Sequence, residues 1–134
     1  GASVNLKYVK GSYMDEIMVD GRPVLFTLDG LPEGREAQAQ QYAEEIWNWV
    51  LEHQSQVVSH APLIAGFKNK KWRSEGEPEV TAEDIIGCLQ RITSIYATYQ
   101  EGFDVFFDTN AVFEERSLVI SIGKNFFFEG FKLL

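Results

Sequence analysis

The sequence predicts an α+β fold, in which a mainly antiparallel sheet carries one long and one short helix on one face. Apolar residues stand at every second position through the last third of the chain, which is typical of strands with one buried face. The middle of the chain instead carries an apolar stripe at helical spacing. Because the strands and helices occur in blocks rather than in alternation, the pattern favours the α+β class.

The last third of the chain predicts a meander of four consecutive strands. They are expected at residues 91–99, 103–109, 117–123 and 125–132. In the second strand, Phe103, Val105 and Phe107 point to one face, and the residues between them point to the other. We therefore expect a sheet with one buried face.

The phenylalanines of the last strand must point to both faces, because three of them follow one another at residues 126–128. We expect Phe127 and Phe131 on the same face as Phe106, and the other two on the opposite face. Either both faces are covered, or one of them binds a partner, since large exposed apolar patches usually mark interfaces.

Two more strands are expected at the amino end, at residues 5–10 and 16–28. The second is broken at Asp20 and Gly21, a dipeptide that tolerates the positive φ angles of a tight hairpin turn. Pro23 has no amide donor, so we expect this hairpin at or near an edge of the sheet.

The long helix is expected to begin after Pro32 and to end at about His60, because the residue before Pro62 avoids helical geometry. Its apolar positions follow the i, i+3, i+4, i+7 spacing of one buried stripe. The stripe consists of Tyr42, Ala43, Ile46, Trp49, Val50, His53 and Val57.

A structured surface loop is expected at residues 63–79, which combine a basic cluster with an acidic run. Thr81 and Asp84 then resemble a capping box, with Asp in place of the usual Glu or Gln. They precede Ile85 and Leu89, so a short second helix is expected here.

The composition is that of a globular, acidic protein, and residues 1–134 are expected to form a single domain. Twenty acidic and twelve basic residues give a net charge of −8, which opposes binding to nucleic acid or anionic membranes and allows a basic protein partner. No segment approaches the roughly 20 apolar residues of a membrane span. With a single cysteine, Cys88, and no secretion signal, we expect a cytoplasmic protein.

The residue types that catalysis needs do not form a recognisable set. His53 and His60 are expected about 10 Å apart on one helix, too far to share a zinc ion. Cys88 has the spacing of a small core residue. Asp104 and Asp108 are expected about 13 Å apart along one strand, which is too far for a carboxylate dyad. We therefore predict no catalytic residues, no metal site and no cofactor.

The acidic pair Glu114 and Glu115, with Asp108, offers oxygen ligands but lacks the spacing of a calcium-binding loop. A solvated acidic sheet edge is the favoured interpretation of these residues.

The best candidate for a ligand site is the basic cluster around Trp72. An aromatic ring flanked by Lys70, Lys71 and Arg73 can stack on a planar ligand while the cations hold an anion, and His60 is expected nearby. The favoured alternative is that Trp72 anchors the loop to the core while the cations stay in water.

Residues from about 69 to 131 resemble a family of small bacterial proteins known only as a domain of unknown function. The resemblance rests on Trp72 and on three short segments. These segments are EVTAEDI at 79–85, FDVFFD at 103–108 and LVISI at 118–122. In the family pattern a glycine-histidine pair follows the aromatic between the last two segments, whereas Glu114 and Glu115 follow Phe113 here. The resemblance implies a bacterial protein and supplies no activity.

Two functions remain after this survey. The first is a non-catalytic, acidic, cytoplasmic interaction module, of the kind formed by immunity proteins and antitoxins, which binds a protein partner or a second copy of itself. The second is a small enzyme or a protein that binds a small molecule or anion beside Trp72 and His60. The absence of a catalytic set favours the first.

Overall fold

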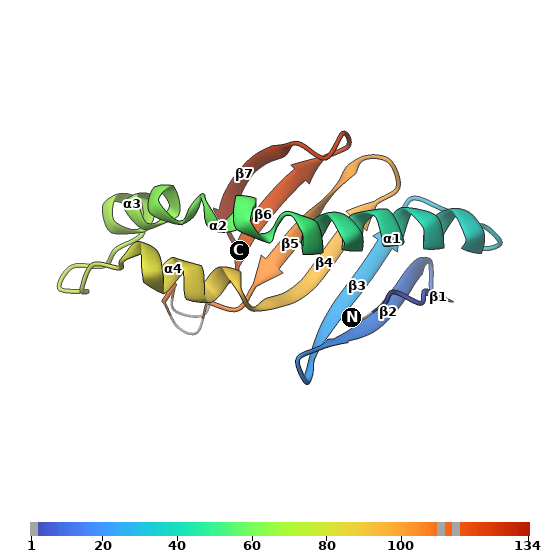
Figure 1. Cartoon of the computed structure of the whole chain (residues 1–134), viewed down its shortest axis with the longest axis horizontal. Coiled ribbons are helices and arrows are strands. Elements are labelled where there is room, and N and C mark those ends of the chain that lie inside the picture. Colours follow the sequence, from blue (N-terminus) through green and yellow to red (C-terminus); the bar gives the residue numbers. More distant parts are fainter. Residues whose placement is uncertain (1–2, 110–111, 114–115) are drawn as a thin grey trace.

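The structure is a computed structural model that describes residues 3–109, 112–113 and 116–134 (Figure 1). Its seven strands form one sheet in chain order, from β1 to β7. The strands are β1 (Lys7–Val9), β2 (Ser12–Val19), β3 (Arg22–Asp29), β4 (Ile92–Thr98), β5 (Gly102–Phe107), β6 (Leu118–Gly123) and β7 (Phe128–Leu133). Neighbouring strands are antiparallel except β3 and β4, which are parallel. The predicted carboxy-terminal meander, β4 to β7, is confirmed.

The helices lie on one face of this sheet and together form the connection between the parallel strands β3 and β4 (Figure 1). They are α1 (Glu36–Glu52), α2 (Gln54–Val58), α3 (Ala61–Lys71) and α4 (Ala82–Leu89). This arrangement confirms the predicted α+β class. Within the described residues, no helix combines the length and the apolar character that crossing a membrane requires.

The core lies between the helices and the sheet face that they cover. Alternate residues of the strands point into it, including Phe26 of β3, Ile95 of β4 and Ile120 of β6, and all three are buried. From the helices, Ile46 of α1 and Ile85 of α4 are fully buried against them. Period-two strands and period-3.6 helices thus meet through their apolar faces, as the sequence pattern predicts.

The helical region differs from the prediction, because the long helix ends at Glu52 rather than at about His60. His53 adopts a non-helical backbone, stacks its ring on Trp49 at 4.4 Å and places Nδ1 2.8 Å from the Trp49 carbonyl oxygen. The loop expected at residues 63–79 is wrong up to Lys71, since α3 occupies this stretch. Pro62 lies in the first turn of α3, where its missing N–H has no helical partner to lose.

The capping box of α4 is confirmed. The Thr81 hydroxyl accepts a hydrogen bond from the Asp84 amide at 3.2 Å, and the Thr81 amide donates to the Asp84 carboxylate at 2.9 Å. The two bonds satisfy donors that the first turn of a helix otherwise leaves free.

The expected faces of the carboxy-terminal phenylalanines are confirmed for Phe126 and Phe128, which lie opposite Phe106, and wrong for Phe131. Phe126 has a φ of 64° and lies in the turn, and the pairing of β6 with β7 shifts by one residue at Ser121. As a result Phe126, Phe128 and Phe131 all pack on the helical side. A bulge changes the alternation of side chains, and sequence periodicity does not reveal it.

The turn from β4 to β5 holds a close backbone approach. Gly102 is buried with a φ of 109°, and a Cβ atom placed on it would lie 2.4 Å from the carbonyl oxygen of Ile122 on β6. This position therefore requires glycine.

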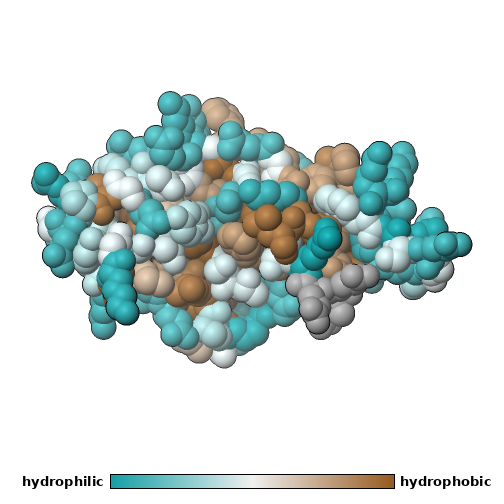
Figure 2. All heavy atoms as spheres, turned by 180° about the vertical axis from the view of Figure 1, so that it is seen from behind, coloured by the Kyte–Doolittle hydropathy of each residue, from teal (hydrophilic) through white to brown (hydrophobic). Residues whose placement is uncertain are grey.

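No helix of the described residues covers the second face of the sheet, and Figure 2 shows apolar side chains among polar ones on this side. Met18, Leu25 and Tyr96 are exposed here, whereas Phe106 is half-buried. The alternation of antiparallel strands allows such a face to be solvated.

Candidate functional site

Three of the five predicted site residues line one shallow pocket of about 270 Å³. This Trp72 pocket is lined by Lys68, Lys71, Trp72, Arg73, Ser74, Phe113, Arg116 and Leu133. Lys70 lies outside it, on a part of α3 where Leu63 and Phe67 are exposed. His60 precedes α3 and stacks on Phe128 with ring centroids 3.9 Å apart. The structure thus separates His60 and Lys70 from the other three.

Trp72 ends α3 and is half-buried among three aromatic rings. Its ring centroid lies 5.9 Å from that of Phe113, 6.2 Å from that of Phe131 and 6.1 Å from that of Phe67. The first two contacts are edge-to-face, a favoured geometry for aromatic pairs. Trp72 therefore anchors the end of α3 against β7, and a ligand would meet only the part of the indole that these rings leave open.

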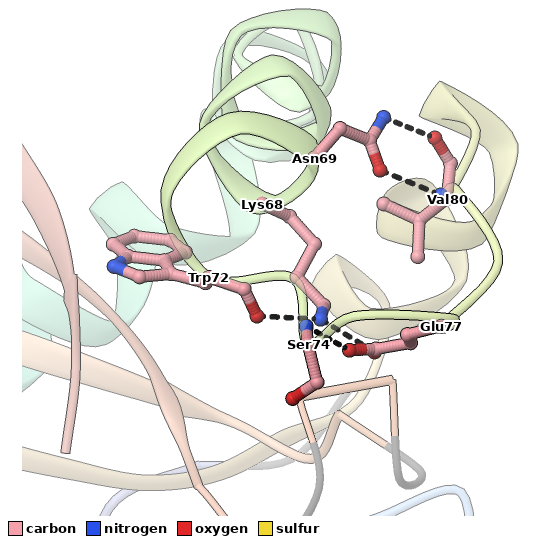
Figure 3. A network of polar contacts seen from close by, with 6 residues as sticks. All are labelled: Lys68, Asn69, Trp72, Ser74, Glu77 and Val80. Carbon is pink, nitrogen blue, oxygen red and sulfur yellow. Dashed lines mark hydrogen bonds and ion pairs between the residues drawn. The ribbon is translucent and has the colours of Figure 1, made fainter.

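Lys68 belongs to the basic cluster of the sequence, but its burial was not predicted. Its side chain is only 1% exposed, and its ammonium donates to the Trp72 carbonyl oxygen at 2.8 Å and to the Glu77 carboxylate at 2.6 Å (Figure 3). The signal was its spacing from Ala61, Ile64 and Ala65, which are the other buried residues of α3. That spacing becomes readable only when the segment is recognised as a helix.

Glu77 neutralises Lys68 and organises the segment that follows α3. One carboxylate oxygen accepts from Lys68, and the other accepts from the Ser74 amide at 2.8 Å (Figure 3). These bonds, that from Lys68 above all, hold the pKa of Glu77 below its usual value. Asn69 adds two hydrogen bonds to the backbone of Val80, of 2.8 and 3.0 Å. The basic cluster thus lies at the end of α3 and at the start of a loop that these hydrogen bonds hold in place.

The cations available to a ligand in the Trp72 pocket are Lys71 and Arg116. Both are exposed, and neither forms an ion pair with another residue in the described part of the chain. Arg73 lies 3.2 Å from Glu79. Two free cations at a polar pocket can hold an anion. The predicted acidic pair Glu114 and Glu115 lies outside the described residues.

A larger cavity of about 520 Å³ lies between the helices and the β2–β3 hairpin. Its lining includes Asp20 and Arg22 of the hairpin, Trp47 and Leu51 of α1, and Gln90. None of the described residues that line it is a histidine or a cysteine. The lining thus offers polar contacts and apolar surface.

The residues with catalytic potential are dispersed. Cys88 is buried and lies 3.5 Å from the Thr109 carbonyl oxygen, and its burial raises the pKa of the thiol, which disfavours the reactive thiolate. Asp104 accepts a hydrogen bond from Ser121 at 2.7 Å, whereas Asp108 lies 3.9 Å from Arg91. Across the described ranges, no three His, Cys, Asp or Glu side chains come together as metal ligands would.

Exposed carboxylates lie along α1. This α1 acidic face consists of Glu44, Glu45 and Glu52, on the side of the helix turned away from the core, and of Glu36 in the first turn. None of them forms an ion pair with a described residue. Glu52 even lies in the last turn, where the helix dipole disfavours negative charge. Glu45 and the nearby Glu101 also contribute to the raised pKa of Tyr42, after the larger effect of its burial.

Comparison of the chain with models of protein families gave no match, and comparisons with curated proteins and with solved structures gave none either. The resemblance to the bacterial domain of unknown function therefore stays a prediction. What the protein does has to be inferred from the surfaces described above.

Proposed function

We propose that this protein is a non-catalytic interaction module that binds a basic protein partner through the α1 acidic face, in the manner of an immunity protein or an antitoxin. The observation that carries the proposal is the set of four exposed carboxylates on one helix without ion-pair partners among the described residues. Glu52 supports the proposal further. It lies in the last turn of α1, where a negative charge lowers the stability of the helix, so helix stability does not explain its presence.

A surface of this kind favours a partner with clustered lysine and arginine residues. Complementary charge speeds association and makes the complex sensitive to salt. The net charge of −8 works in the same direction for a basic protein and against nucleic acid or anionic lipid.

The test is affinity capture at low and high salt, with identification of the captured protein by mass spectrometry. The variant Glu44→Gln, Glu45→Gln, Glu52→Gln is expected to lose the partner. The control Glu16→Gln, Glu75→Gln, Glu83→Gln removes three exposed carboxylates elsewhere and is expected to retain it. Equal capture by both variants, or no partner at low salt, would count against the proposal.

A second candidate function is binding of a small anion in the Trp72 pocket, supported by the free cations Lys71 and Arg116. Inorganic phosphate is expected to raise the Tm relative to chloride at equal ionic strength, because a ligand that binds the folded state stabilises it. Lys71→Ala with Arg116→Ala should abolish this shift. The control, Lys70→Ala with Lys124→Ala, should keep the shift in Tm. An equal shift in both variants would show that phosphate does not bind in the Trp72 pocket.

A further inference from the structure

Strand β7 forms one edge of the sheet, and α3 runs beside it on the helical face. No described strand pairs with its outer side, because β7 stands last in the sheet order (Figure 1). Along β7, Phe128 contacts His60 at the start of α3, and Phe131 contacts Phe67 and Trp72 towards its end. An unpaired edge strand is a template for a further strand.

Exposed apolar side chains gather at this edge. The two most exposed large apolar residues in the described part of the chain are Phe127, at 72%, and Leu134, at 62%, and they flank β7 on either side. Leu63 and Phe67 of α3 are also exposed, at 54% and 43%. These four account for nearly half of the nine large apolar residues that are exposed. Such a concentration marks an interaction surface.

The backbone of β7 has hydrogen-bonding groups that point to the free side. Ser117 and Leu134 exchange two backbone hydrogen bonds, of 2.9 and 3.0 Å, so Leu134 points its polar groups towards β6. In an antiparallel ladder these groups alternate in direction from one residue to the next. Leu133 and Phe131 therefore direct their N–H and C=O groups outwards.

We propose that β7 pairs in antiparallel fashion with β7 of a second copy of this chain, about a two-fold axis at Phe131. Residues with outward backbone groups must face each other in the new ladder, which an axis at Phe131 or at Lys132 would achieve. The axis passes through Phe131, because an axis at Lys132 would set the two Lys132 side chains directly opposite each other. The result is one continuous sheet across two molecules. This interface does not involve the α1 acidic face, so it stands independently of the proposed function.

Self-complementarity identifies a second copy as the occupant. Antiparallel pairing places the amino end of one strand beside the carboxyl end of the other, so Phe127 of each copy lies beside Leu134 of the other, near its α3. The pairing thus covers the exposed side chains at both ends of β7, Phe127 and Leu134, in each copy. Charge agrees, since this register sets Lys132, which lies 3.8 Å from Asp104 of its own chain, opposite Gly130 of the second copy, so that no like charges face each other directly.

The test is the oligomeric state, measured by analytical ultracentrifugation over a range of concentrations. Wild-type protein is expected to form dimers. Phe127→Ser is expected to raise the dimer dissociation constant by about 100-fold, because each dimer loses two buried phenylalanines. The control Met18→Ser removes a residue of similar exposure, 55%, from the uncovered sheet face and should leave dimerisation unchanged.

Hydrogen exchange tests the register independently. The amides of Phe131 and Leu133 should become protected as the concentration rises, and they should lose that protection in Phe127→Ser. Leu63→Ser serves as a second interface variant if Phe127→Ser unfolds. The proposal is overturned if the wild type stays monomeric, if the dimer survives both interface variants, or if Met18→Ser dissociates it.

Discussion

The ammonium of Lys68 lies in the interior of the protein, where Glu77 supplies its counter-charge. The stability of the fold is therefore expected to depend on Glu77. We expect Glu77→Gln to lower the Tm, because the buried ammonium loses its counter-charge while remaining 1% exposed. Adding Lys68→Met should restore part of the loss, since an apolar side chain of similar length needs no counter-charge. Thermal unfolding of the two variants measures this, and a double variant less stable than Glu77→Gln would contradict it.

The same carboxylate makes stability depend on pH. The pKa of Glu77 is lowered in the folded state, chiefly by its hydrogen bond with Lys68. A lowered folded pKa means that the stabilisation is complete above the unfolded value of 4.5 and is lost as the pH falls through the folded value. Asp29, whose pKa is lowered by hydrogen bonds from Ser12 and Tyr96, acts in the same direction.

We therefore expect the urea midpoint of the wild type to fall from pH 6 to about pH 3, over the range in which carboxylates titrate. The midpoint of Glu77→Gln should fall less over this range, because glutamine does not titrate. If the urea midpoints of the two proteins fall in parallel, Glu77 does not contribute to the pH dependence of stability.

At the scale of single elements, α4 depends on its capping box. Thr81→Ala removes the hydroxyl that accepts from the Asp84 amide, and it is expected to cost about 1 kcal/mol of unfolding free energy. Ser55→Ala removes an exposed hydroxyl of α2 and should change stability by less than about 0.5 kcal/mol. Urea unfolding compares the two, and equal losses would refute the role of the cap.

The elements divide into those that local sequence predicts and those that it does not. The β4–β7 meander and the α4 cap were predictable, because periodicity and capping chemistry are local. The break at His53 was not, since the sequence has no helix-breaking residue there: neither glycine nor proline stands between Glu52 and His60. Pro62 was misread because proline both ends one helix and fits the first turn of the next.

The candidate site was predictable in part. Lys71, Trp72 and Arg73 follow one another in the sequence, so their clustering was visible. Arg116 reaches the same pocket from the connection between β5 and β6, and only the tertiary fold brings it there. The β7 edge was equally hidden, because the order of strands in a sheet is not a local property.

At the scale of the whole molecule, the parallel pair β3 and β4 joins the amino-terminal strands to the meander. A single core packed beneath one layer of helices is expected to unfold in one step. Far-ultraviolet circular dichroism and tryptophan fluorescence should then give the same midpoint, because Trp47 and Trp49 report on α1 and Trp72 on the end of α3. Two separate midpoints would show that the chain contains more than one cooperative unit.

The buried glycine in the β4–β5 turn constrains how this sequence can vary. A side chain at Gly102 would meet a backbone oxygen of the neighbouring strand, which can move only if the sheet moves with it. Gly11 and Gly21 also have positive φ angles, but no atom lies within 4 Å of the position a Cβ would take. A library randomised at all three positions and selected for folding should return asparagine and aspartate beside glycine at 11 and 21. At position 102 it should return glycine alone. We therefore expect relatives of this chain to keep glycine here even where their surface residues differ.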